Sequence, residues 1–136
     1  MACEQALRLA PDGYARKVES DRTRQMLELA AAEETPIMVF IGNRGCLQIH
    51  TGPVRNIRRF GSEWLNVLDD DFNMHLRDTA VASVWIVRKP TIDGVVTSLE
   101  LFDEGGNTLV MFFGKRKPGS AEDDAWRMII SKLERT

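Results

Sequence analysis

The chain has 136 residues, of which 43% are hydrophobic and 28% are charged, proportions that are ordinary for a soluble globular protein. This length suits one domain built around a single core. The formal net charge of −2 argues against a strongly basic nucleic-acid-binding protein, and no apolar run approaches the length of a membrane span.

The cysteines and the first residues bear on where the protein resides. Cys3 and Cys46 lie far apart and form no C-x-x-C motif, so they indicate neither a zinc site nor a disulfide framework. Two thiols in a chain of this size suit a reducing compartment. The opening residues, MACEQALRLAPDG, lack the basic region and apolar stretch of a secretory signal. We therefore expect a cytoplasmic protein with no membrane insertion.

Residues 1–35 predict a helical lead-in. A short helix over 4–10 is followed by a candidate strand over 14–18. Ser20 or Asp21 then begins a second helix that runs to about Glu34, because their side-chain oxygens can accept hydrogen bonds from the free amides of a first helical turn.

Residues 36–114 predict an antiparallel sheet. Apolar residues alternate along several short runs, and turn signals such as Gly42–Gly45 and Asp93-Gly94 separate these runs. We expect a meander in which consecutive strands pair. The residues expected in the core of the domain are Val39, Ile41, Leu47, Ile49, Trp85, Leu99, Leu101, Trp126 and Ile130.

Residues 120–135 predict a C-terminal helix. Ser120 is the expected cap, the acidic residues 122–124 suit the positive end of a helix dipole, and Trp126 and Ile130 fall at helical spacing. The chain therefore predicts a single α+β domain over 1–136, with a large antiparallel sheet between N-terminal and C-terminal helices.

The residues alone indicate no active site. His50 and His75 are the two histidines, and neither has acidic or thiol neighbours at the spacing of a metal site or a nucleophile. A lone histidine in a strand is more often a structural residue than a metal ligand. The basic segment Arg55–Arg59 has no aromatic residues between its arginines, so it predicts solvated surface and no nucleic-acid partner.

Cations beside apolar strands are the more informative feature. Arg88 and Lys89 close one predicted strand, and Lys115–Lys117 follow another strand that carries Met111 and Phe113 on one face. An apolar sheet face with converging cations would suit a flat ligand with an anionic edge. Ordinary strand-end charges explain the same pattern equally well.

Four long segments closely resemble one protein family: PIMVFIGNRGCLQIHTGPV, WLNVLDDDFNMHLR, VWIVRKPTIDGVVTSLELFDEGG and MFFGKRKPGSAEDDAWR. They are similar to the C-terminal half of haem-utilisation proteins of the HemS/HmuS type, described as haemin-transport or haemin-degrading factors. The resemblance implies one repeat of a two-repeat fold, with haem lying between a helix and the sheet.

The resemblance also implies site residues. Lys89 and Arg116 match the family's propionate-binding cations, Met111 and Phe113 match positions that line the haem plane, and Phe40 is a weaker candidate for the same wall. The family's axial histidine belongs to a D-x-H-x-F segment ahead of the part matching EQALRL. We therefore expect that histidine to be absent from this chain and no residue to ligate the iron, with His75 and His50 as less favoured substitutes.

The implied function is a cytoplasmic module that binds and passes on haem in bacterial haem-iron acquisition. The alternatives are a haem-degrading, oxygenase-like enzyme half and a scaffold of the same fold without haem. Ring opening needs iron held with an open coordination position, so we do not expect this chain alone to be an enzyme. Besides haem, the expected partners are a second copy in a homodimer or the missing N-terminal half, together with contact with a haem-import permease.

Overall fold

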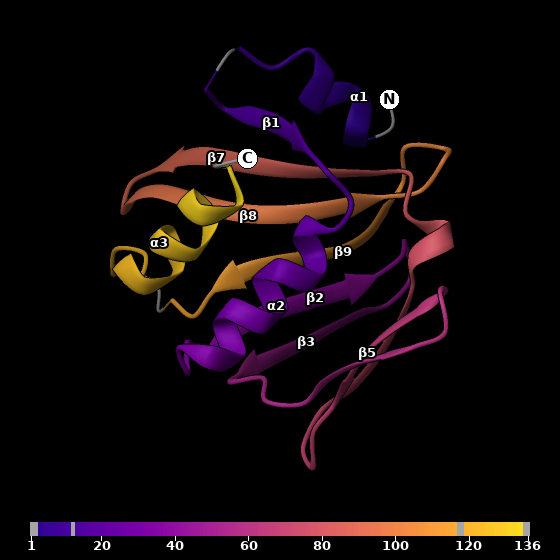
Figure 1. Cartoon of the computed structure of the whole chain (residues 1–136). Helices are drawn as coiled ribbons and strands as arrows, with labels where there is room; N and C mark the ends of the chain where they lie inside the picture. Colours follow the sequence, from indigo (N-terminus) through magenta and orange to yellow (C-terminus); the bar gives the residue numbers. More distant parts are fainter. Residues whose placement is uncertain (1–2, 12, 117–118, 135–136) are drawn as a thin grey trace.

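The computed structural model describes residues 3–11, 13–116 and 119–134 and confirms an α+β fold (Figure 1). The elements in chain order are α1 (Cys3–Arg8), β1 (Ala15–Val18), α2 (Arg22–Ala32), β2 (Ile37–Gly42), β3 (Leu47–Gly52), β4 (Ile57–Phe60), β5 (Trp64–Leu68), β6 (Asn73–Arg77), a 3-10 turn (Asp78–Ala80), β7 (Ser83–Thr91), β8 (Gly94–Phe102), β9 (Thr108–Gly114) and α3 (Asp124–Leu133). No helix in the described part of the chain is long and apolar enough to cross a bilayer.

The strands form two sheets rather than the single meander expected over 36–114. One sheet has six strands in the order β1-β7-β8-β9-β2-β3, and β4-β5-β6 form a separate three-stranded sheet. The strand β1 confirms the strand expected over 14–18 in the lead-in, and it pairs with β7 at the edge of the larger sheet. The strand β2 is apolar on both faces, and it lies between β3 and β9, where neighbours on both sides satisfy its backbone.

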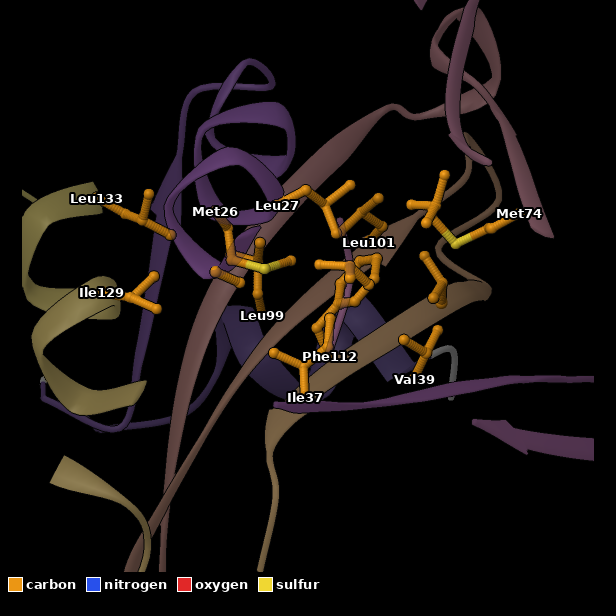
Figure 2. Close-up of a cluster of buried hydrophobic side chains, with 14 of the residues drawn as sticks. Met26, Leu27, Ile37, Val39, Met74, Leu99, Leu101, Phe112, Ile129 and Leu133 are labelled. Carbon is orange, nitrogen blue, oxygen red and sulfur yellow. The ribbon is translucent and has the colours of Figure 1, made fainter. Parts of the chain in front are cut away.

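One face of the six-stranded sheet carries the main core. Both α2 and α3 lie on this face (Figure 1), and their apolar residues meet those of the strands (Figure 2). Met26 and Leu27 from α2 and Ile129 from α3 are fully buried. The sheet contributes Ile37, Val39, Leu99, Leu101 and Phe112, each at 0% exposure, and Met74 joins them from the smaller sheet.

The last helix begins later than the expected 120–135. Its first helical residue is Asp124, and the carboxylate of Asp123 accepts a hydrogen bond from the amide of Ala125 at 3.0 Å. Just before this helix, the buried Glu122 side chain accepts a hydrogen bond from the amide of Thr97 on β8. Asp123 therefore replaces Ser120 as the cap. The expected end at 135 lies outside the described residues.

A glycine permits the close approach of α3 to the sheet. A Cβ on Gly114, at the end of β9, would lie 2.6 Å from Cγ of Trp126. The Trp126 indole is fully buried, and its Nε1 donates to the carbonyl of Thr97 at 2.9 Å. The helix is thus fixed to β8 and β9 by one ring.

The prediction that Leu47 and Ile49 belong to the core is wrong. Leu47 is 59% exposed and Ile49 is 50% exposed. Both lie on β3, at the edge of the six-stranded sheet. Their cross-strand partners, Gly42 and Phe40, place them on the face opposite Val39. The alternation of side chains along β3 was predicted correctly, but α2 covers the face that bears Val39 and not the face that bears Leu47 and Ile49.

Candidate functional site

The candidate site lies on the face of the six-stranded sheet opposite α2 and α3, which we call the open face. The strand register aligns its side chains in rows that cross all six strands. One row is Lys17, Trp85, Glu100, Met111, Phe40 and Ile49. The next row is Ala15, Val87, Ser98, Phe113, Met38 and Thr51.

Two neighbouring cavities on this face contain all five haem-binding residues expected from the sequence. The larger, of about 420 Å³, is lined by Ala6, Leu7, Phe40, Gly42, Asn43, Leu47, Lys89, Glu100, Thr108, Leu109 and Met111. The smaller, of about 260 Å³, is lined by Met38, Phe40, Val96, Phe113, Gly114, Arg116 and Glu122. Phe40 lines both cavities, so one ring separates the Lys89 side from the Arg116 side.

The floor of the site is aromatic and sulfur-rich. The rings of Phe40 and Phe113 meet edge to face, with centroids 5.2 Å apart and an angle of 61° between planes. Met111 pairs with Phe40 and Met38 pairs with Phe113 across β2 and β9. Aromatic rings and thioethers give a polarizable surface that adapts to a flat apolar ligand.

Both cations already have acidic partners. The Nζ of Lys89 lies 3.8 Å from Oε2 of Glu100. One guanidinium nitrogen of Arg116 lies 3.1 Å from Oδ2 of Asp93 and 3.4 Å from the carbonyl of Ser120. An anionic ligand must therefore share or replace these carboxylates. The neighbouring Lys117 lies outside the described residues.

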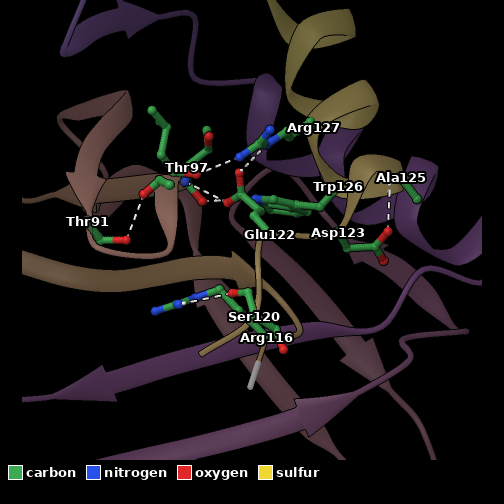
Figure 3. A network of polar contacts seen from close by, with 11 residues as sticks. Thr91, Thr97, Arg116, Ser120, Glu122, Asp123, Ala125, Trp126 and Arg127 are labelled. Atoms are coloured by element: carbon green, nitrogen blue, oxygen red, sulfur yellow. Dashed lines mark hydrogen bonds and ion pairs between the residues drawn. The ribbon is translucent and has the colours of Figure 1, made fainter. Parts of the chain in front are cut away.

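Two buried glutamates border the cavities, and the sequence analysis missed both. Glu100 is 5% exposed and accepts a 2.6 Å hydrogen bond from the hydroxyl of Ser98. Glu122 accepts from the amide of Thr97 at 2.6 Å and from Nε of Arg127 at 3.0 Å (Figure 3). The sequence feature that could have identified Glu100 is its position as the single acidic residue within the apolar run SLELF.

The helix α1 forms one wall of the larger cavity through Ala6 and Leu7. Glu4 anchors this helix, because its carboxylate accepts hydrogen bonds from the hydroxyl of Ser83 and from Nε1 of Trp85. These bonds, with that of Ser83 the strongest influence, hold the pKa of Glu4 below its ordinary value. The helix α1 thus borders the sheet at this site.

Neither histidine lies on the open face. His50 pairs with Val39 and so points to the opposite side of the sheet, where its ring stacks on Phe72 with centroids 3.9 Å apart. His75 lies on β6, and its Nδ1 is 2.8 Å from Oδ1 of Asn66. Among the described residues, no group of three histidine, cysteine, aspartate or glutamate side chains is arranged to hold a metal ion.

The open face therefore fits the porphyrin part of haem better than its iron. Its rings and thioethers match the apolar plane, and Lys89 and Arg116 match carboxylates at the edge of that plane. The described residues on this face include no histidine that could ligate the iron.

Comparison with known proteins identifies the family of the chain. The model of the haemin-degrading HemS/ChuX domain matches residues 1–133. The chain is 43% identical over 130 residues to the hemin transport protein HmuS of Yersinia pestis, covering 96% of this chain and 37% of that protein. The chain therefore spans little more than a third of the length of this curated relative.

Solved structures give the same result. The structure of holo-PhuS, a heme-binding protein from Pseudomonas aeruginosa, superimposes with a TM-score of 0.93 at 47% identity and covers 97% of this chain and 38% of that chain. ChuS, an E. coli heme oxygenase, gives a TM-score of 0.93 at 41% identity and covers 98% and 40%. On these grounds the chain belongs to the HemS/ChuX family of haem-utilisation domains.

Proposed function

We propose that this chain is a haem-binding module of bacterial haem-iron acquisition and that haem lies on the open face. The observation that carries the proposal is that the apolar side chains of Met38, Phe40, Met111 and Phe113 stay partly exposed and line two cavities that also contain Lys89 and Arg116. The porphyrin packs on Met38, Phe40, Met111 and Phe113. Its propionates bind Lys89 and Arg116.

Ring contact and charge supply most of the affinity in this arrangement. Burial of apolar surface contributes roughly 25 cal/mol per Å², and a flat ring offers a large apolar area. Each charge-assisted hydrogen bond adds roughly 1.5–3 kcal/mol before competition from Glu100 and Asp93 is subtracted. The iron contributes little, because neither histidine reaches this face.

Cargo is the role that best suits such a site. A carrier must release haem, and binding without a strong iron ligand favours release. We place this transfer in the cytoplasm, with a haem-import permease as a candidate donor. The relatives that are named hemin transport proteins support this role. Since the chain spans 37% of those relatives, the other part of a longer protein or a second copy is expected to complete the cover over haem.

The test is a titration of the purified chain with haemin, followed by the Soret band. We expect a saturable, roughly 1:1 shift of the band away from its position in free haemin. Phe113→Ala and Arg116→Gln should weaken the binding, whereas Lys132→Met, which removes a cation on α3, should not. An unshifted spectrum would identify a scaffold of this fold without haem.

Haem degradation is the second candidate, because ChuS, at 41% identity, is described as a heme oxygenase. The distinguishing experiment adds ascorbate to the haem-loaded chain in the presence of catalase and records the spectrum. We expect haem to stay intact, since ring opening needs iron held with an open coordination position and neither histidine lies on the open face to hold it. A biliverdin-like product under these conditions would establish degradation instead.

A further inference from the structure

Glu100 is a buried carboxylate on the open face that the proposed binding of haem does not use. The residue is 5% exposed, although it lines the larger cavity. Its neighbours on the adjacent strands are Trp85 and Met111, and neither carries a charge. A carboxylate buried among such side chains is unfavourable unless it accepts hydrogen bonds and is paired with a cation. The partners of Glu100 therefore matter to any ligand that lies over it.

Two side chains contact the Glu100 carboxylate. The hydroxyl of Ser98 donates to Oε2 of Glu100 at 2.6 Å, and Nζ of Lys89 lies 3.8 Å from the same oxygen. The Ser98 hydroxyl is neutral, and Lys89 is the only cation that forms an ion pair with Glu100 in the part of the chain that the structure describes. Lys89 is therefore the residue that balances the buried negative charge.

The strand register shows how Lys89 reaches this oxygen. Glu100 pairs with Trp85, and Lys89 lies four residues beyond Trp85 on the same strand. Its side chain therefore extends back along the open face toward the middle of the sheet. The Lys89 side chain is 59% exposed, whereas that of Glu100 is 6% exposed. The lysine is thus the partner that is free to turn away, and the glutamate is the partner that stays in place.

We propose that Glu100 is a positioning residue that competes with haem for Lys89 and so promotes the release of haem. The inference rests on the proposed function, in which Lys89 binds a propionate. When Lys89 turns to a propionate, Glu100 keeps its hydrogen bond from Ser98 but loses its cation. A buried charge without its partner is strongly unfavourable. The return of Lys89 to Glu100 therefore favours departure of the ligand.

The second cation of the site has a different kind of partner. Asp93, which pairs with Arg116, has a side chain that is 22% exposed, and its Oδ2 also accepts from the amide of Gly119 at 3.1 Å. Water and this amide still solvate Asp93 when Arg116 turns to a propionate, so that loss of the ion pair is less unfavourable there. The competition is therefore concentrated at Lys89.

This competition acts on charged ligands and spares neutral ones. A flat ring without carboxylates has no group that can replace Glu100 beside Lys89, so the ion pair persists when such a ring binds. Covering the Glu100 side chain changes its solvation little, because it is already 6% exposed. Glu100 should therefore weaken the binding of a porphyrin with free carboxylates and leave the binding of its neutral ester unaffected.

The test compares haemin with haemin dimethyl ester in Soret titrations of the parent and Glu100→Gln. Glutamine keeps the shape of the side chain and can still accept from Ser98, but it has no charge to hold Lys89. We expect Glu100→Gln to bind haemin about fivefold more tightly than the parent does, with unchanged affinity for the ester. Transfer of haemin to an excess of apomyoglobin should be slower by a similar factor, because affinity changes at one site appear mainly in the dissociation rate.

Three further variants serve as controls. Glu33→Gln removes a carboxylate that pairs with Lys132 at the ends of α2 and α3, and it should leave haemin affinity unchanged. Asp93→Asn should strengthen haemin binding less than about twofold, because Asp93 is the more exposed partner. In a Lys89→Met background, Glu100→Gln should no longer strengthen haemin binding, since no lysine remains for Glu100 to hold.

The outcomes separate this inference from the proposed function. An unshifted Soret band in both the parent and Glu100→Gln would refute haem binding on the open face, and the inference with it. A normal shift in the parent with equal or weaker haemin binding by Glu100→Gln would overturn the inference alone. A gain of equal size for haemin and its dimethyl ester would also overturn it, because Glu100 would then act on the ring and not through Lys89.

Discussion

Phe112 and Phe113 are adjacent in β9, and they show how differently the two faces of one sheet are used. Phe112 pairs with Val39 and Leu99 and is fully buried beneath the helices. Phe113 pairs with Met38 and Ser98 and lines a cavity on the open face. The residue type and the strand are the same. What covers each face decides whether a phenylalanine stabilises the fold or is available to a ligand.

The difference holds for β2 and β9, whereas open-face residues of β7 and β8 such as Trp85 and Val87 are buried. On the packed face each fully buried apolar side chain contributes roughly 1.5–3 kcal/mol before the loss of conformational entropy is subtracted. On the open face the side chains of Met38, Phe40, Met111 and Phe113 remain partly exposed to water, so that contribution has not been fully realised. Haem, or another chain, can gain it on binding. This reserve of unburied apolar surface is the physical basis of the proposed site.

The largest expected effect is the contrast between alanine substitutions at these two positions. Phe112→Ala should lower the free energy of unfolding by roughly 3–5 kcal/mol, because it leaves a cavity in the main core. Phe113→Ala should cost less than about 1.5 kcal/mol in stability and should weaken haemin binding instead. Urea denaturation measures the first effect and Soret titration the second.

Equal destabilisation by the two substitutions would show that the open face is as structural as the packed one. Phe40→Ala serves as a second open-face variant, because Phe40 contacts Phe113 and lines both cavities. It should resemble Phe113→Ala in both assays.

The next effect concerns charge on the open face. Lys89→Met and Arg116→Gln keep much of each side chain and remove its cation, so each should weaken haemin binding about tenfold. This loss of binding free energy is at the lower end of the range for a charged hydrogen bond, because Lys89 and Arg116 already form ion pairs with Glu100 and Asp93. The measurement is the haemin Kd from absorbance, with melting temperatures recorded to confirm folding.

His50→Ala and His75→Ala are the matched tests of iron ligation. Both should leave the Soret position of the complex unchanged, since His50 stacks on Phe72 and His75 contacts Asn66, away from the open face. A Soret band that returns to free haemin in either variant, while Lys89→Met binds normally, would assign that histidine to the iron and refute the charge-based site.

The sequence predicted the strands and the apolar alternation well, because both depend on local residue order. Most of the expected core is buried, including Val39, Leu99, Leu101 and Trp126. The errors at Leu47 and Ile49 have one cause: a period of two reveals two faces but not which of them the helices cover. The division into two sheets was likewise missed, since strand order depends on contacts between distant segments.

The candidate site was predicted through family resemblance, and the structure adds the interactions that local patterns do not reveal. From the sequence, Lys89 and Arg116 were expected to be available to a ligand. In the structure Lys89 pairs with Glu100, 11 residues later, and Arg116 pairs with Asp93, 23 residues earlier. The anchoring of α1 joins Glu4 to Ser83, which lie 79 residues apart. Such pairs are set by strand register, which composition and spacing do not specify.

A smaller effect is expected on self-association. Leu47 and Ile49 expose apolar surface at the edge of the open face, and a two-fold dimer is the common way to bury such a surface. Light scattering at tens of micromolar should show association, and Ile49→Ser should weaken it about fivefold. Ile92→Ser, which alters a fully exposed residue of the β7–β8 turn, is the control. A monomer at every concentration would contradict self-association through the open face.

The smallest expected effect is the response of α1 to acid. The pKa of Glu4 lies below its ordinary value of 4.5, chiefly because the hydroxyl of Ser83 donates to the carboxylate. The ionised form therefore stabilises the docked helix fully above pH 4.5, and this stabilisation is lost as the pH falls through the folded-state pKa. The indole N–H resonance of Trp85, which donates to the same carboxylate, should shift in that acidic range in NMR spectra.

Glu4→Gln keeps the shape of the side chain and removes its titration, so its Trp85 resonance should stay constant there. If that resonance moves with the same midpoint in Glu4→Gln, another group controls the docking of α1 and with it the wall of the larger cavity.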